Sequence, residues 1–202
     1  MLLGLLAGTW SFRLGLFLLR DRVFNGKEDG SYQSLMDSWG ECAERRILRL
    51  FLIQAIFIVL FSLPFLPVVG SSVRPFVLWD ILAIAVWLTA VIGESLADRQ
   101  LARWRANPVN RDQTCRHRLW RYSRHPNYFF EWLHWWTYVF LAAGSSWWWL
   151  TLFGPALMLF LLYRVTGIPY TEAQALRSRG EDYARYQRTT SAFFPWFPRR
   201  ST

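Results

Sequence analysis

Long apolar runs alternate with short, arginine-rich polar stretches along this chain. A helix needs about 20 mostly apolar residues to cross the hydrocarbon core of a membrane. Five segments reach or approach that length: Leu2–Leu19, Leu48–Leu66, Phe76–Leu96, Phe129–Ala143 and Trp147–Tyr163. The pattern predicts an all-α, polytopic integral membrane bundle of about five transmembrane helices, forming a single membrane domain over residues 1–202.

The last two apolar segments are short, and only the tripeptide 144–146 separates them. We interpret them as a tight helical hairpin rather than as one long kinked helix. The three tryptophans at 147–149 fit a belt of aromatic side chains at the membrane interface. A hydrophobic fraction of 53% with 13 Trp agrees with a membrane protein.

The arginines predict the orientation of the bundle, because short loops rich in Arg and Lys stay in the cytoplasm. Eight Arg and two acids lie between Asp98 and Tyr128, and seven Arg and three acids follow from Arg164 onward. The stretch Pro67–Pro75 contains only Arg74, and 144–146 has no charge. We therefore expect the N-terminus outside and the C-terminus in the cytoplasm.

The net charge of +9 leaves two explanations open. Arginines can simply attract the anionic heads of membrane lipids. They can also bind a phosphate-rich ligand, since Arg forms bidentate bonds to phosphate and Lys27 is the sole lysine. Nucleic acid is not expected, because the basic residues flank membrane helices and no recognition motif is present. Cys42 and Cys115 lack the spacing of a metal site or a disulfide, so no metal is expected.

Three acids fall inside or beside the apolar segments, where charge is costly unless it is paired or functional. Asp80 lies near the expected outer end, where we expect water to reach it. Glu94 and Glu131 lie near the cytoplasmic ends of their segments. Glu94 is four residues from Asp98, and Asn127 is four from Glu131, so each pair shares a helix face. The spacing predicts one polar layer beneath the arginine-rich loops.

Two interpretations of this layer remain open. It can be a structural group of salt bridges to Arg103, Arg105 or Arg124. It can also be a cofactor pocket, in which arginines bind phosphates while carboxylates and an amide bind hydroxyl and carboxamide groups. The aromatic residues available for stacking on a cofactor ring are Trp120, Tyr122 and Tyr128.

Several stretches carry a family resemblance. They are LWRYSRHPNYFFE, GIPYTEAQALRSRGEDYARYQRTTSAFFPWFP, GESLADRQLARWRANPVNR and, more weakly, WSFRLGLFLL. Together they resemble the steroid 5-alpha-reductase superfamily, closest to its bacterial membrane branch of unknown function (domain of unknown function 1295). The RHPNY core also occurs in isoprenylcysteine carboxyl methyltransferases, but its combination with ADxQ and TSAFFPW is typical of the reductase side.

The resemblance implies a cytoplasm-facing cavity that holds NADPH, built mainly from residues 76–198. It assigns the role of contacting the cofactor to these residues: Glu94, Asp98, Arg105, Arg124, Asn127, Glu131, Glu172, Tyr183 and Tyr186. Within that set the two arginines would bind phosphates, and Asn127 and Glu131 the nicotinamide end. Tyr128 and His125 are the candidate proton donors, and Glu131 completes the expected catalytic group.

The function implied is NADPH-dependent reduction of a carbon–carbon double bond in a hydrophobic lipid or steroid-like enone, in the bacterial inner membrane. The alternatives are a methyltransferase that uses S-adenosylmethionine, or a non-catalytic membrane protein. Two departures affect the substrate side. Phe130 stands where relatives commonly have Gly, and we expect its larger side chain to narrow the nicotinamide site. Trp10 stands near the position at which steroid reductases have a tyrosine that contacts the substrate's carbonyl group. Relatives also usually carry additional helices before Leu2–Leu19.

Overall fold

The computed structural model describes residues 2–19, 43–70, 78–165 and 167–199. The described residues form helices and no strand, which confirms the all-α prediction. The elements in chain order are α1 (Leu2–Leu19), α3 (Ala43–Ser62), η3 (Leu63–Phe65), α4 (Leu66–Val69), α5 (Leu78–Ala106), η4 (Pro108–Asn110), α6 (Leu119–Tyr122), α7 (Pro126–Leu141), η5 (Trp148–Leu152), α8 (Phe153–Arg164) and α9 (Ile168–Thr189).

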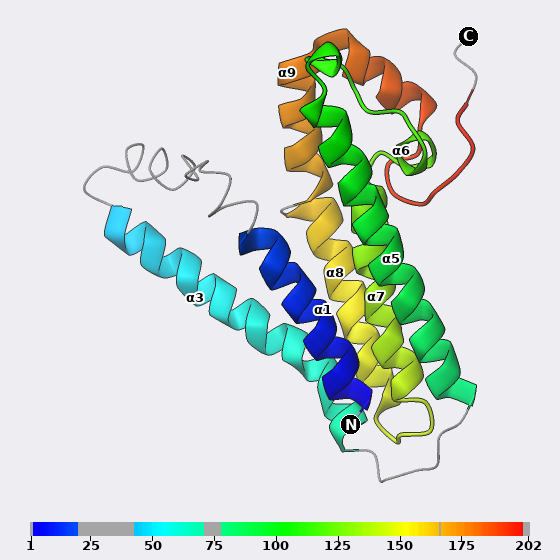
Figure 1. Cartoon of the computed structure of the whole chain (residues 1–202). Helices are drawn as coiled ribbons and strands as arrows, with labels where there is room; N and C mark the ends of the chain where they lie inside the picture. Colours follow the sequence, from blue (N-terminus) through cyan, green and yellow to red (C-terminus); the bar gives the residue numbers. More distant parts are fainter. Residues whose placement is uncertain (1, 20–42, 71–77, 166, 200–202) are drawn as a thin grey trace.

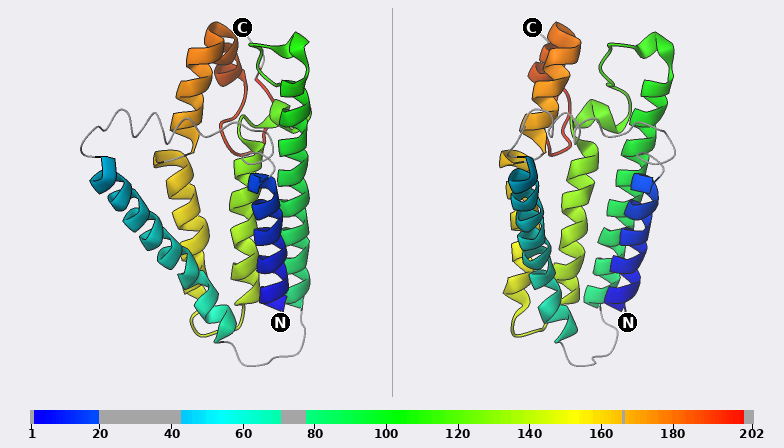
Figure 2. Two further views of the ribbon diagram at one scale, coloured as in Figure 1. Left: turned by 60° about the vertical axis from the view of Figure 1, so that its left-hand side comes forward. Right: turned by 90° about the vertical axis from the view of Figure 1, so that its left-hand side faces the viewer.

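Helices α1, α5, α7 and α8 lie side by side as a bundle (Figure 1). Helix α3 meets this bundle at one end and leans away from it toward the other (Figure 2). Within the described part of the chain, three helices are long and apolar enough to cross a membrane: Glu44–Val69, Leu78–Ala106 and Trp148–Thr189. In the last of these the apolar residues precede α9, which is rich in charged side chains. The chain therefore has the helices of a membrane protein, while five spans and their orientation stay predictions.

The expected hairpin is confirmed, because α7 and α8 are separate helices joined through η5. The two helices pack closely where Gly154 faces Trp135. A Cβ atom on Gly154 would lie only 2.6 Å from Cε3 of that indole ring. A larger residue at 154 would therefore push α8 away from α7.

Small residues on α5 allow an equally close approach to α7. Ala83, Ala90 and Ala97 are fully buried at seven-residue intervals, which places them on one helix face. Gly93 continues this face, and a Cβ atom there would lie 2.3 Å from the ring of Phe130. The ring of Phe130 therefore fills the space left by Gly93 between the two helices, while the expectation that it narrows the cofactor site stays a prediction.

Asp80, in the first turn of α5, is less exposed than the sequence predicted. The sequence placed it at a helix end within reach of water, whereas the structure buries it to 8% exposure. The apolar segments of α1 and α7 pack around this end of α5. A position near a helix end is therefore not enough to expose a side chain to water.

The arginine-rich loop between α5 and α6 folds back onto α9 through one acid. Asp182 accepts a hydrogen bond from the backbone N–H of Thr114 at 2.8 Å and pairs with Arg116 at 2.5 Å. The loop is also held on α5, where Gln100 accepts a bond from the N–H of Leu119. These contacts bring the loop, α6 and α9 together at the end of the bundle that carries the C-terminal end of α5 (Figure 2).

Candidate functional site

A cavity of about 730 Å³ lies where the C-terminal half of α5, the loop before α6, the start of α7 and α9 meet. This volume is within the range of sites that hold cofactors and other small molecules. The lining residues are Leu14, Glu94, Asp98, Leu101, Ala102, Arg105, Thr114, Cys115, Trp120, Arg124, His125, Asn127, Tyr128, Glu131, Thr171, Gln174, Ala175, Ser178, Arg179, Tyr183 and Tyr186.

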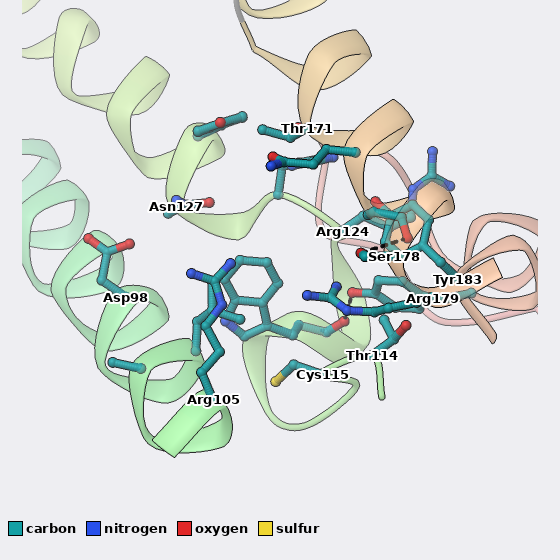
Figure 3. A pocket seen from close by; sticks show the side chains of 18 of the residues that line it. Asp98, Arg105, Thr114, Cys115, Arg124, Asn127, Thr171, Ser178, Arg179 and Tyr183 are labelled. Carbon is teal, nitrogen blue, oxygen red and sulfur yellow. Dashed lines mark hydrogen bonds between the residues drawn. The ribbon is translucent and has the colours of Figure 1, made fainter. Parts of the chain in front are cut away.

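Charged and hydroxyl-bearing side chains come from two opposite walls of this cavity. Asp98 and Arg105 project from α5, while Ser178 and Arg179 project from α9 (Figure 3). Helix α9 is broken at Gly180, whose φ of 51° and ψ of −126° suit glycine and interrupt the helix. This break separates the turn that carries Arg179 from the turn that carries Tyr183, so both reach the same space.

The inner part of the cavity is acidic. Glu94 and Asp98 on α5 and Glu131 on α7 lie close enough to interact electrostatically. Asn127 lies one turn before Glu131 and within hydrogen-bonding reach of Asp98. Its Oδ1 is buried without a hydrogen-bond partner among the described residues. A ligand that offers an N–H or O–H group would satisfy this oxygen.

Arg13 of α1 supplies the positive charge that faces these acids. Its Nη2 lies 2.5 Å from Oε1 of Glu94, and the two side chains are 22% and 10% exposed. The sequence had suggested Arg103, Arg105 or Arg124 for such a role, so the salt-bridge partner comes from a different helix. The acidic layer thus contains a structural ion pair as well as residues that line the cavity.

Arg124 and Glu172 form the centre of a second polar group. The Arg124 Nε donates to Glu172 Oε1 at 2.7 Å, and His125 Nε2 donates to the same oxygen at 3.2 Å. Gln187 donates to the other carboxylate oxygen at 2.8 Å. Burial alone raises the pKa of the Glu172 carboxyl, but the hydrogen bonds from His125, Arg124 and Gln187 and the charge of Arg124 outweigh it and lower the pKa to about 2. Glu172 is therefore a fixed negative charge.

The C-terminal segment closes over this end of the bundle. Arg124 Nη1 donates to the carbonyl oxygens of Gln187 and Thr190 at 2.8 and 2.7 Å, and its backbone N–H donates to Ser191 at 2.9 Å. Tyr186 hydrogen-bonds to the carbonyl of Trp120. One arginine thus joins the start of α7 to both the end of α9 and the residues after it.

His125 and Tyr128, the expected proton donors, stack on each other with ring centroids 5.2 Å apart and planes 8° apart. Both line the cavity, but the Nε2 of His125 is already engaged by Glu172. Among the other predicted residues, Trp120, Tyr183 and Tyr186 line the cavity from buried positions.

Tyr122 is a predicted site residue that lies elsewhere. Its ring packs against Phe197 with centroids 5.9 Å apart, and its carbonyl accepts the N–H of Trp196. Glu172 does not line the cavity directly and acts through Arg124 and His125. The remaining predicted residues, from Glu94 to Tyr186, meet at one cavity.

Several lining residues were missed by sequence reasoning: Leu14, Thr114, Cys115, Thr171, Gln174, Ser178 and Arg179. Arg179 had a usable signal, since it belongs to the arginine excess that follows Arg164. Cys115 is buried at 3% exposure, and burial raises the pKa of its thiol. It therefore lines the wall as a neutral thiol rather than as a thiolate nucleophile.

Comparison with known proteins identifies one family. The family model described as "Protein of unknown function (DUF1295)" matches residues 1–190. No curated protein and no solved structure matches the chain.

Proposed function

The chain belongs to the DUF1295 family, and we propose that it is a membrane-embedded, NADPH-dependent reductase of a carbon–carbon double bond in a lipid or steroid-like enone. The observation that carries the proposal is the distribution of charge in one cavity of about 730 Å³. Arginines from α5 and α9 face each other across it, and an amide with an unpartnered oxygen lies beside carboxylates at its inner end.

These residues fit the parts of a dinucleotide phosphate. Arg105 and Arg179 would bind phosphates, for which guanidinium groups are suited by charge and by their fork of donors. The Oδ1 of Asn127 and the carboxylate of Glu131 would accept the two hydrogens of a carboxamide. The Arg124–Glu172 group would hold α9 in place over the bound molecule. NADPH, when bound, supplies a hydride.

The substrate would enter from the membrane, since the bundle that holds the cavity is built of apolar helices. Exclusion of water by the closing C-terminal segment would strengthen each polar interaction in the site. We place the cavity on the cytoplasmic side of the bacterial inner membrane, because the arginine-rich loop and α9 lie at this end.

Titration of the purified protein with NADPH and with S-adenosylmethionine tests the proposal. A ligand that binds only the folded state stabilises it, by about 2.7 kcal/mol when its concentration is 100 times its Kd. We expect NADPH to raise the melting temperature and S-adenosylmethionine to leave it unchanged. Stabilisation by S-adenosylmethionine alone would favour the methyltransferase, and stabilisation by neither would favour a non-catalytic protein.

Substitution of the facing arginines should weaken NADPH binding selectively. For Arg105→Ala and for Arg179→Ala we expect a loss of about 1.5–3 kcal/mol each, the usual range for a hydrogen bond to a charged group. Arg103→Ala is the matched control, because Arg103 lies exposed on α5 and does not line the cavity. Binding isotherms of the three variants provide the measurement. Equal affinities in all three would contradict the assignment of the phosphates to this cavity.

A further inference from the structure

A buried pair of polar side chains lies on α7 just beyond the inner end of the cavity. The Nε2 of His134 and the hydroxyl oxygen of Tyr138 are 2.7 Å apart, and both residues are 1% exposed. The surroundings are apolar: Tyr138 belongs to a core cluster with Leu6 and Leu141. Polar groups at such a depth are costly and are usually retained for a function or a partner.

The pair continues the polar face of α7 that the cavity exposes. Asn127, Glu131, His134 and Tyr138 follow one another at intervals of four, three and four residues, so they lie along one side of the helix. Glu131 lines the cavity and lies close enough to Tyr138 to interact with it electrostatically. His134 and Tyr138 are therefore the next polar residues along this face of α7 beyond Glu131, although neither lines the cavity itself.

Trp10 of α1 also links the pair to the cavity. Its indole ring stacks on the imidazole of His134, with centroids 4.7 Å apart and planes 18° apart. The same side chain also lies near Glu94, which lines the cavity, although its Nε1 has no hydrogen-bond partner among the described residues. Trp10 is thus next to both an acidic residue of the cavity and the imidazole of the buried pair.

The N–H and O–H hydrogens of the pair outnumber the hydrogen bonds that the two residues form with each other. A neutral imidazole carries one N–H and a phenol carries one O–H, so two hydrogens are available. The contact between His134 and Tyr138 uses one of them, and the Nδ1 of His134 has no partner among the described residues. If Nε2–H donates to the phenol oxygen, the Tyr138 hydrogen is free for an acceptor. In the other tautomer the free hydrogen is on Nδ1.

We propose that His134 and Tyr138 form the binding site for the substrate's carbonyl oxygen and that Tyr138 donates the proton that the reduction consumes; this inference rests on the proposed function. Hydride addition to the β-carbon of an enone forms a C–H bond and shifts the π electrons onto the carbonyl oxygen. The Tyr138 O–H donates its proton to that oxygen, and the resulting enol becomes the ketone as the proton moves to the α-carbon. His134 is a positioning residue that orients the hydroxyl, which regains a proton from water that enters through the cavity.

The assignment explains how the chain functions with Trp10 at a position that offers no hydroxyl. It also separates two tasks along α7: Asn127 and Glu131 would hold the cofactor, and the pair one to two turns further on would hold the substrate. His125 and Tyr128 are then not required as acids, in agreement with the contact between His125 and Glu172.

The test uses a long-chain cyclohexenone labelled with carbon-13 at the carbonyl, bound to the purified full-length protein. We expect the infrared band of the labelled carbonyl to move to lower frequency in the wild type, because a hydrogen bond weakens the C=O bond. In Tyr138→Phe, which removes only the hydroxyl, the band should return to the frequency of the unbound state. Thr137→Val is the matched control, since it removes another buried hydroxyl of α7 and should keep the shift. An unchanged shift in Tyr138→Phe would overturn the proposal.

Kinetics provide the second measurement. Loss of one preorganised donor to a developing oxyanion lowers kcat by roughly 100-fold or more, and we expect this for Tyr138→Phe with NADPH affinity unchanged. His134→Gln keeps an N–H donor and should retain most activity, whereas His134→Leu should not. A kcat in Tyr138→Phe within threefold of the wild type would overturn the proposal.

The experiments distinguish a wrong proposed function from a wrong assignment of the carbonyl site to His134 and Tyr138. If the wild type binds no NADPH, the infrared experiment alone decides, because it needs no cofactor. A shifted band that Tyr138→Phe abolishes would still establish a ketone site at the pair. Absence of any shift in the wild type would overturn it. If Tyr138→Phe does not fold, His134→Leu is the second variant: the Tyr138 hydroxyl loses the partner that orients it, so most of the shift should be lost, and an unchanged shift would overturn the proposal.

Discussion

Replacing Arg13 with Met is expected to lower the free energy of unfolding by about 3–5 kcal/mol, the usual cost of removing one partner of a buried ion pair. Arg13 pairs with Glu94 at 2.5 Å, and Asp98 and Glu131 lie in the same electrostatic group. One guanidinium therefore faces three carboxyl groups within a bundle of apolar helices. Its removal would leave the acids without their nearest positive charge. Equilibrium unfolding in detergent with increasing denaturant measures the effect.

A double variant distinguishes the charge effect from a loss of packing. In Arg13→Met with Glu94→Gln, one positive and one negative charge are removed together, so the net formal charge of the group stays as in the wild type. We expect the double variant to recover more than half of the stability that the single variant loses. A double variant no more stable than Arg13→Met would show that the long side chain of Arg13 acts through its packing instead.

This ion pair also illustrates why part of the site was hidden from sequence reasoning. The boundaries of α1 were predicted from hydropathy alone and agree with the structure. A long apolar run of this kind is typical of a helix that crosses a membrane. The same hydropathy made Arg13 look like a mere interruption of the run. Nothing local indicates that residue 13 meets residue 94, because the pairing depends on how α1 packs against α5.

Spacing along a single helix was more informative. Pairs four residues apart, such as Glu94 with Asp98 and Asn127 with Glu131, were expected to share a face, and all four residues line the cavity. Helical geometry fixes such neighbours regardless of the rest of the fold. His134 and Tyr138 obey the same rule, yet they lay in a tryptophan-rich run that is explained equally well by membrane burial.

The contribution of α9 could be expected only in outline. Glu172, Tyr183 and Tyr186 were assigned through the family resemblance, and the structure brings both tyrosines to the cavity. Arg179 was missed because α9 bends at Gly180, and a lone glycine in a polar helix does not predict the direction of a bend. Tyr122 was wrongly predicted to line the cavity for a related reason. The residues after α9 return across α6, and they cover the ring of Tyr122.

Replacing Arg124 with Ala is expected to be as disruptive as the change at Arg13, with a loss of about 3–5 kcal/mol. Arg124 and Glu172 are 11% and 14% exposed, so the variant leaves a buried carboxylate without its cation. It also removes the two hydrogen bonds to the carbonyls of Gln187 and Thr190. Arg121→Ala is the matched control: this neighbouring arginine is exposed, and its loss should change stability by no more than about 0.5 kcal/mol. Denaturant unfolding of the two variants gives the comparison, and limited proteolysis should cut Arg124→Ala first near its C-terminus.

The same carboxylate predicts a dependence on pH. The folded protein lowers the pKa of Glu172 from its usual 4.5 to about 2, so the folded state favours the ionised form. The resulting stabilisation is fully present above pH 4.5 and is lost as the pH falls toward about 2, because the unfolded chain then binds a proton that the folded chain does not. Glu172→Gln lacks this titration, and we expect its stability to decline less than that of the wild type across that interval. Parallel stability curves for the two proteins would mean that Arg124 does not hold Glu172 in its charged form, and the link between α7 and the C-terminal segment would then have to rest on the backbone carbonyls alone.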